Sequence, residues 1–231
     1  MRYLLIGGWI LVLASFTEVN YKPMAIDDFK KVIAVFEQTP QYHLKQVQRR
    51  YSNGELLRET LAENLRYNNF YYASHDSVFS LNTLTKSLGV DLREKVMTYK
   101  YGYHKANEER ANAMLASVVS TIEQAVSIDY EEIDLERGKY TLWVLQGNTW
   151  KIEYTLNKVN HRLEEARFYN HYPEYDFDEE VLISYSLKTG KIRLNDRKYD
   201  FDYYIREHST GVEPADNFSD FNLQSLNLKT K

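Results

Sequence analysis

Apolar side chains recur at helical spacing in two segments of the chain. Over residues 25–39 they lie three and four positions apart, which predicts a helix with one apolar face, and Pro40 ends it. A second, stronger stripe begins after Asn107, which can cap a helix, and runs to about Ser127. At a rise of about 1.5 Å per residue, its roughly 20 residues would form a helix about 30 Å long, enough to cross a small sheet. The stripe consists of Ala111, Met114, Leu115, Val118, Val119, Ile122, Ala125 and Val126.

Most of the remaining chain alternates between apolar and polar positions, which is the period of a β-strand. Asn53-Gly54 is a turn signal between two Tyr-rich runs and predicts a hairpin there. From Ile128 onward, turn signals mostly recur at intervals of about 8 to 12 residues, as in an antiparallel meander. The early strand candidates are residues 42–51, 61–72, 77–82 and 95–103, and the clearest later alternations are Trp150, Ile152, Tyr154, Leu156, then Val181, Ile183, Tyr185, Leu187, then Tyr199, Phe201, Tyr203, Ile205.

Each of these strands has one apolar and one polar face, as a sheet that is covered on a single side requires. The sequence therefore predicts an α+β fold in which a curved antiparallel β-sheet, an incomplete barrel, has helices covering its concave face. The 20 tyrosines fit such a sheet. They either line a half-wet core with their hydroxyls at its edge or stack on an aromatic or carbohydrate ligand.

The N-terminal segment is more apolar than the rest of the chain. After Arg2, the stretch Tyr3–Phe16 holds 14 largely apolar residues, too few for a membrane-spanning helix and typical of an export signal. We interpret residues 1–17 as a cleavable signal peptide and residues 22–231 as a single domain. An uncleaved anchor and a buried N-terminal strand are the alternatives. The mature protein is expected to be periplasmic and soluble, without an integral membrane segment.

Composition and motif content exclude several classes of partner and of catalytic chemistry. The 29 Lys and Arg residues and 33 Asp and Glu residues are interspersed, giving a net charge of -4 that argues against nucleic acid as a partner. The chain has no cysteine, which removes disulfides, zinc thiolate sites and thiol catalysis. Hydrolase, phosphate-loop, dinucleotide and zinc-protease motifs are absent, so we expect no enzyme, no metal and no cofactor. A hydrolase built on Glu131, Glu132 and Asp134 is the weakest hypothesis, since these residues fit a charged strand edge.

In its order of elements, the chain resembles the periplasmic lipoprotein carriers of the Lol system, the LolA and LolB-like proteins. The resemblance spans residues 25–205 and is strongest in the paired strands after the long helix. It implies an incomplete β-barrel with a helical lid and an apolar cavity for acyl chains. In such carriers, an arginine followed by proline, asparagine and an aromatic residue helps to hold the lid closed. The segment Arg66-Tyr67-Asn68-Asn69-Phe70 is similar, although Tyr67 stands in place of the proline. The similarity implies a lid-latch role for Arg66.

Two functions follow as hypotheses. The first is a carrier or chaperone that shelters the acyl chains of a lipoprotein or lipid in an apolar cavity. The second is a non-catalytic envelope interaction or assembly protein of the same fold, with a protein partner and a cavity filled by its own aromatic side chains. For the first, the expected cavity lining is Met114, Leu115, Val118, Ile122, Leu142, Val144, Ile152, Tyr154, Ile183 and Tyr185.

Overall fold

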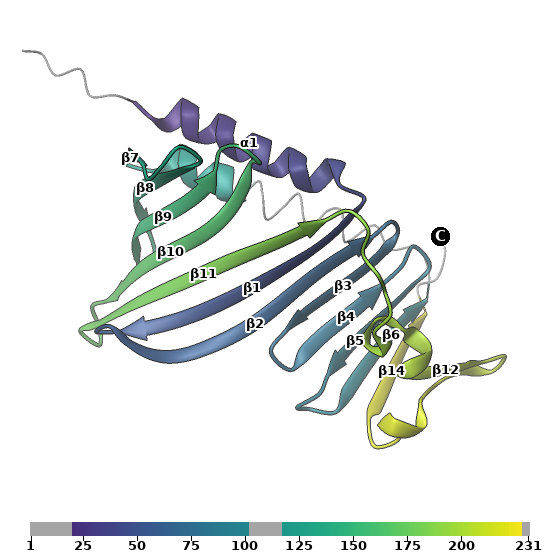
Figure 1. Ribbon diagram of the computed structural model, residues 1–231. Coiled ribbons are helices and arrows are strands. Elements are labelled where there is room, and N and C mark those ends of the chain that lie inside the picture. The colour runs from purple at the N-terminus through teal and green to yellow at the C-terminus, as the bar shows by residue number, and fades with distance from the viewer. Residues whose placement is uncertain (1–19, 102–116, 228–231) are drawn as a thin grey trace, which may run out of the picture.

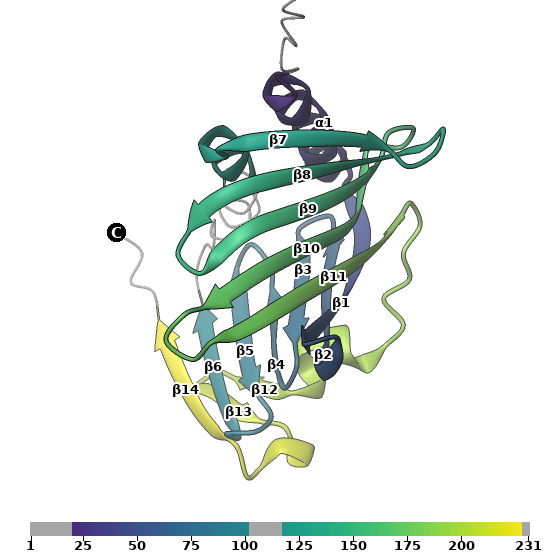
Figure 2. The same ribbon diagram turned by 90° about the vertical axis from the view of Figure 1, so that its left-hand side faces the viewer.

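The computed structural model describes residues 20–101 and 117–227 and shows one large, curved, open sheet (Figure 1). The sheet has 12 strands in the order β14-β6-β5-β4-β3-β2-β1-β11-β10-β9-β8-β7, and only the β14–β6 pair is parallel. Helix α1 (Lys22–Gln38) and a short helix at residues 117–124 lie against the β7–β10 end (Figures 1 and 2). The predicted α+β fold with an incomplete barrel and covering helices is confirmed.

The first strands are β1 (Gln41–Ser52), β2 (Glu55–Tyr67), β3 (Phe70–His75), β4 (Val78–Asn82), β5 (Lys86–Asp91) and β6 (Val96–Tyr101). The later strands of the sheet are β7 (Ser127–Glu132), β8 (Arg137–Gln146), β9 (Thr149–Asn157), β10 (Arg162–Tyr172), β11 (Phe177–Thr189) and β14 (Asn222–Asn227).

The two halves of this sheet bury apolar side chains on opposite faces. Leu44 of β1 lies opposite Asn64 of β2, so these two side chains share the face that α1 covers. The next residue along β2, Leu65, is buried on the other face. There, strands β2–β6 pack against the segment that follows β11, in a second apolar cluster that includes Phe201, Tyr204 and Ile205. Apolar and polar side chains thus still alternate along each strand, but the face of the sheet that is buried changes near β1 and β2.

Several predicted elements are confirmed with shifted ends. Helix α1 begins at Lys22, and the Asn53-Gly54 turn joins β1 to β2 with both residues at positive φ. The predicted strand at residues 61–72 is instead two strands, because a turn at residues 68–69 separates β2 from β3. Strand β5 was not predicted. The second predicted helix is seen at residues 117–124, and its expected beginning lies outside the described residues, as does the expected signal at 1–17.

The expected strand through Tyr199 and Tyr203 was wrong. Two 3-10 helices, η1 (Arg197–Tyr199) and η2 (Phe201–Tyr203), occupy the segment. The carboxylate of Asp196 accepts a hydrogen bond from the backbone N–H of Lys198, and Asp200 accepts the equivalent bond from the residue two positions further on. Such local side-chain bonds offer the backbone an alternative to a strand ladder. After them come a small hairpin of β12 (Ile205–His208) and β13 (Gly211–Pro214), and a third 3-10 turn, η3 (Asp216–Phe218).

Gly138 is required by the packing of Tyr130 across the β7–β8 pair. A Cβ atom at position 138 would lie 2.7 Å from the Tyr130 ring, whose hydroxyl is held by Lys158 at 2.9 Å. Gly138→Ala is therefore expected to reduce the free energy of unfolding by about 1–3 kcal/mol, measured by urea denaturation. Gly89→Ala is the matched control, since its Cβ would only reach a carbonyl oxygen at 4.0 Å. Equal losses in the two variants would contradict the steric explanation.

Candidate functional site

A cavity of about 350 Å³ lies between α1, the helix at 117–124 and strands β1 and β8–β11. Phe29, Val32 and Phe36 form its α1 side, and Val118 belongs to the short helix. The sheet contributes mainly apolar and aromatic side chains, namely Leu44, Ile152, Tyr154, Phe168, Tyr185 and Leu187. A concave, mostly apolar wall with few polar groups is the usual form of a small-ligand site.

Specific contacts hold α1 over the cavity. The ring of Phe29 meets Tyr154 edge to face, with centroids 4.9 Å apart. Nearby, the Tyr140 hydroxyl donates a hydrogen bond of 2.7 Å to the Asp28 carboxylate. Lys22 Nζ donates to the backbone carbonyls of Glu123 and Ala125, both at 3.0 Å, where the short helix ends. A lysine at this position stabilises the helix C-terminus and ties the two helices together.

The structure brings four of the predicted lining residues to the cavity wall: Val118, Ile152, Tyr154 and Tyr185. Three others, Ile122, Leu142 and Val144, are almost fully buried in the adjoining core and do not line the cavity. Ile183 is half-buried on β11 and is also not part of the wall. Met114 and Leu115 lie outside the described residues.

Sequence reasoning missed the α1 side chains and Arg162. The apolar face of α1 was visible in the spacing of its residues, but the longer predicted helix was expected to form the cover. Arg162 stands at the start of β10 and lines the cavity as a charged residue in a mostly apolar wall. Its position depends on how β10 and β11 separate, which no local pattern in the sequence indicates.

Arg66 lies on β2, on the same face of the sheet as Leu44. Its guanidinium carbon is 5.6 Å from the ring centroid of Tyr71, and its register partner on β1 is Tyr42. Arg66 is not one of the side chains that line the cavity. The lid-latch role stays a prediction.

Burial governs the ionisation of the tyrosines at the site. It raises the pKa of Tyr185 to about 12 and also raises the pKa of Tyr154. The pKa of Tyr140 is raised by burial and by its hydrogen bond to Asp28. At neutral pH these hydroxyls are therefore uncharged, which suits an apolar ligand.

Alkaline pH is expected to destabilise the protein through Tyr154 and Tyr185. An unfolded tyrosine ionises near pH 10, whereas these two keep their protons to higher pH in the folded state. Their contribution to the free energy of unfolding is complete below pH 10 and is lost as the pH rises from 10 towards 12. At pH 11 the expected loss is about 1.4 kcal/mol for each, measured by urea denaturation at pH 9 and pH 11. In Tyr154→Phe the loss should be smaller by about that amount, and an unchanged loss would contradict the explanation.

The opposite face of the β8–β10 region carries an aromatic cluster. Trp143 and Trp150 have ring centroids 5.7 Å apart, Trp150 and Tyr169 are 5.8 Å apart, and Lys151 Nζ lies 3.7 Å from the centroid of Tyr169. The prediction that Trp150 lies on the same face of the sheet as Ile152 was wrong. The β8–β9 register shifts between Trp143 and Gln146, and this irregularity places Trp150 with Trp143 instead.

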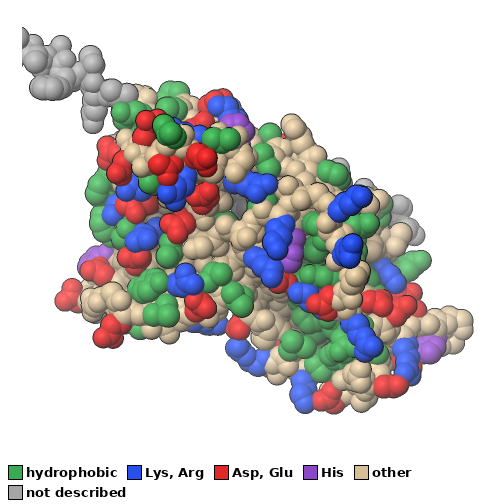
Figure 3. All heavy atoms as spheres, in the orientation of Figure 1, with side chains coloured by type: hydrophobic (Ala, Val, Ile, Leu, Met, Phe, Trp, Pro, Cys, Tyr) green, Lys and Arg blue, Asp and Glu red, His purple; other side chains and the backbone are tan. Residues whose placement is uncertain are grey.

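The remaining surface is mixed in charge. Lys and Arg side chains lie among Asp and Glu side chains on the face in Figure 3. Within residues 20–101 and 117–227, no group of three or more His, Asp or Glu side chains is arranged to hold a metal ion. The helices in that same part of the chain are too short or too polar to cross a membrane.

No protein-family model and no curated protein matches this chain at a significant level. Among solved structures, it is similar to an uncharacterized conserved protein from Thermus thermophilus, at 8% identity over 88% of this chain and 99% of that chain, with a TM-score of 0.42. A LolA superfamily protein from Nitrosomonas europaea is 11% identical over 76% and 96% of the two chains, with a TM-score of 0.29. A putative outer membrane lipoprotein-sorting protein domain from Vibrio parahaemolyticus is 9% identical over 78% and 97%, with a TM-score of 0.34.

The class that the fold defines is thus an open, curved half-barrel with helices packed on one end.

Proposed function

We propose that the protein is an exported, periplasmic carrier or binding protein that shelters an acyl chain of a lipid or lipoprotein in the cavity under α1. The observation that supports this most is the cavity, whose wall is built mainly of apolar side chains from α1, the short helix and the sheet. The apolar stretch Tyr3–Phe16 supports export. Sheltering a chain requires no catalytic residue.

The energetics suit a hydrocarbon ligand. Each methylene moved from water into an apolar site contributes about 0.8 kcal/mol, so a chain of several carbons is held without any covalent bond. The cavity, at about 350 Å³, lies near the lower end of the range of about 300–1,000 Å³ for ligand pockets. Its size favours one chain rather than several.

A fluorescent fatty acid whose emission rises in apolar surroundings tests the proposal. We expect saturable, one-to-one binding to the purified protein, and displacement by unlabelled hexadecanoate. Emission that rises linearly with added probe, without saturation or displacement, would contradict the proposal.

The aromatic cluster supports an interaction protein as the second candidate. Trp143 is 38% exposed, Trp150 is 41% exposed and Leu145 on the same strand as Trp143 is 86% exposed. Exposed tryptophans next to an apolar side chain are enriched at protein interfaces. A discrete cross-linked adduct through this face, formed in the cell envelope by protein whose cavity holds no lipid, would favour this candidate over the carrier.

A further inference from the structure

Strands β10 and β11 separate at one end, beside the cavity. Their ladder joins Glu165–Tyr172 to Phe177–Ser184 and stops there, although β11 continues for five more residues. Those residues, Tyr185–Thr189, pair with β1 on their other side. Figure 1 shows the two strands diverging towards α1. The backbone groups of β11 that face β10 in this stretch are therefore left without a ladder partner from β10.

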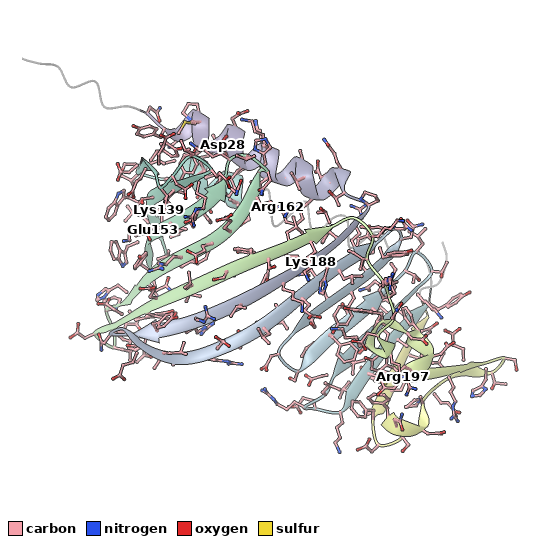
Figure 4. All side chains as sticks on the ribbon, in the orientation of Figure 1. Asp28, Lys139, Glu153, Arg162, Lys188 and Arg197 are labelled. Atoms are coloured by element: carbon pink, nitrogen blue, oxygen red, sulfur yellow. The ribbon has the colours of Figure 1, made fainter. Side chains whose placement is uncertain are left out.

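Arg162 bridges the two strands where they separate (Figure 4). One terminal nitrogen of its guanidinium donates a hydrogen bond of 3.1 Å to the carbonyl oxygen of Leu187, and the other donates one of 3.3 Å to the Thr189 hydroxyl. The first contact is partly buried and the second is exposed, so the guanidinium extends from the interior to the surface. Leu187 and Arg162 both line the cavity, which places this group at the cavity's edge.

The bridging role leaves part of the guanidinium unused. Its Nε atom is buried and has no hydrogen-bond partner among the described residues. Both partners of the terminal nitrogens are neutral, so neither balances the positive charge. Buried polar groups are nearly always hydrogen-bonded, and a buried donor without a partner destabilises the fold, more so when the group is charged. A strand clamp alone accounts for two of the five N–H donors of the guanidinium and leaves the buried Nε–H without a partner among the described residues.

We propose that Arg162 binds the anionic headgroup of the ligand, so that the site takes a single-chain amphiphile with a carboxylate or phosphate at one end. This inference rests on the proposed function, since the chain would occupy the cavity under α1. Guanidinium groups match carboxylate and phosphate oxygens in charge and in geometry. The apolar wall gives affinity for the chain, and Arg162 fixes which end lies at the edge of the cavity.

The test compares three ligands that share a 16-carbon chain, namely hexadecanoate, hexadecyl phosphate and hexadecanol. We expect the wild type to bind at least one of the anions about tenfold or more tightly than the alcohol, as measured by displacement of the fluorescent probe. Whichever anion binds more tightly identifies the headgroup as carboxylate or phosphate. In Arg162→Met the preference should disappear, so that the ratio of anion affinity to alcohol affinity falls to about one.

Arg167→Met is the matched control on the same strand. Arg167 forms an ion pair with Glu180 at 3.1 Å and is not one of the cavity residues, so its loss should leave the anion preference intact. Arg162→Lys keeps the charge and is expected to retain part of the preference. Thermal unfolding of each variant confirms that it is folded, and Arg162→Gln, which also removes the charge, serves in place of Arg162→Met if the latter does not fold.

The outcomes separate the two proposals. An equal anion-to-alcohol ratio in the wild type, or a ratio that Arg162→Met leaves unchanged, overturns the role of Arg162 and leaves a carrier for neutral chains. Failure of all three ligands to bind the wild type overturns both proposals. Inorganic phosphate alone should not displace hexadecanoate at millimolar concentration. Displacement would overturn the proposal of an amphiphile site, because the ion would then bind there without the chain.

Discussion

Val118→Trp is expected to abolish acyl-chain binding while the protein remains folded. Val118 lies on the short helix at 117–124 and forms part of the cavity wall, so an indole at this position would occupy the space of the chain. The expected result is a loss of affinity of about 100-fold or more, because several methylenes worth about 0.8 kcal/mol each can no longer be buried. Displacement of the fluorescent fatty acid measures the effect.

Val126→Trp is the control for this variant. Val126 follows the same helix but is 68% exposed, and it does not line the cavity. Its substitution should leave binding unchanged. If Val118→Trp, with its circular dichroism spectrum intact, bound the probe as tightly as the wild type, the ligand would not occupy this cavity.

Phe29→Ala should cause a large loss of stability, about 3–5 kcal/mol in the free energy of unfolding. The Phe29 side chain is 2% exposed and packs edge to face on Tyr154, so it joins α1 to the sheet and its removal leaves a void. Urea denaturation measures the change. Met24→Ala, at a position 38% exposed on the same helix, should change stability by no more than about 0.5 kcal/mol. A loss below about 1 kcal/mol in Phe29→Ala would show that α1 is not anchored through this ring.

Much of the fold could be predicted from periodicity. The spacing of Phe29 and Val32 predicts the helix, and the alternation of Ile152, Tyr154 and Leu156 predicts a strand with one buried face. An alternating pattern shows that one face of a strand is apolar, but it does not show which element packs on that face. For this reason the change of covered face between Leu44 and Leu65 was not predicted.

The segment after β11 was the least predictable part. Its alternating aromatic residues have the pattern of a strand, yet Asp196 and Asp200 direct the backbone into 3-10 turns that carry Phe201 onto the second core. The local bonds of these two aspartates, together with the packing of Phe201, prevail over the strand pattern.

The candidate site was predicted in part for a related reason. Tyr154 and Tyr185 lie on the cavity wall, whereas Leu142 and Val144 point to the same side of the sheet but are covered by packing. Residues that share a face of a sheet need not share a cavity. Arg162 could not be predicted, because its role depends on the point at which two strands separate.

Lipid extraction tests the carrier proposal most directly. The full-length chain would be expressed in a Gram-negative host, purified from the periplasm without detergent, and extracted with organic solvent for mass spectrometry. We expect about one acyl chain per protein molecule in the wild type and a strongly reduced amount in Val118→Trp purified in parallel. Wild-type protein that is folded and yields no lipid, or a Val118→Trp protein that yields as much as the wild type, would contradict a carrier that holds its cargo under α1.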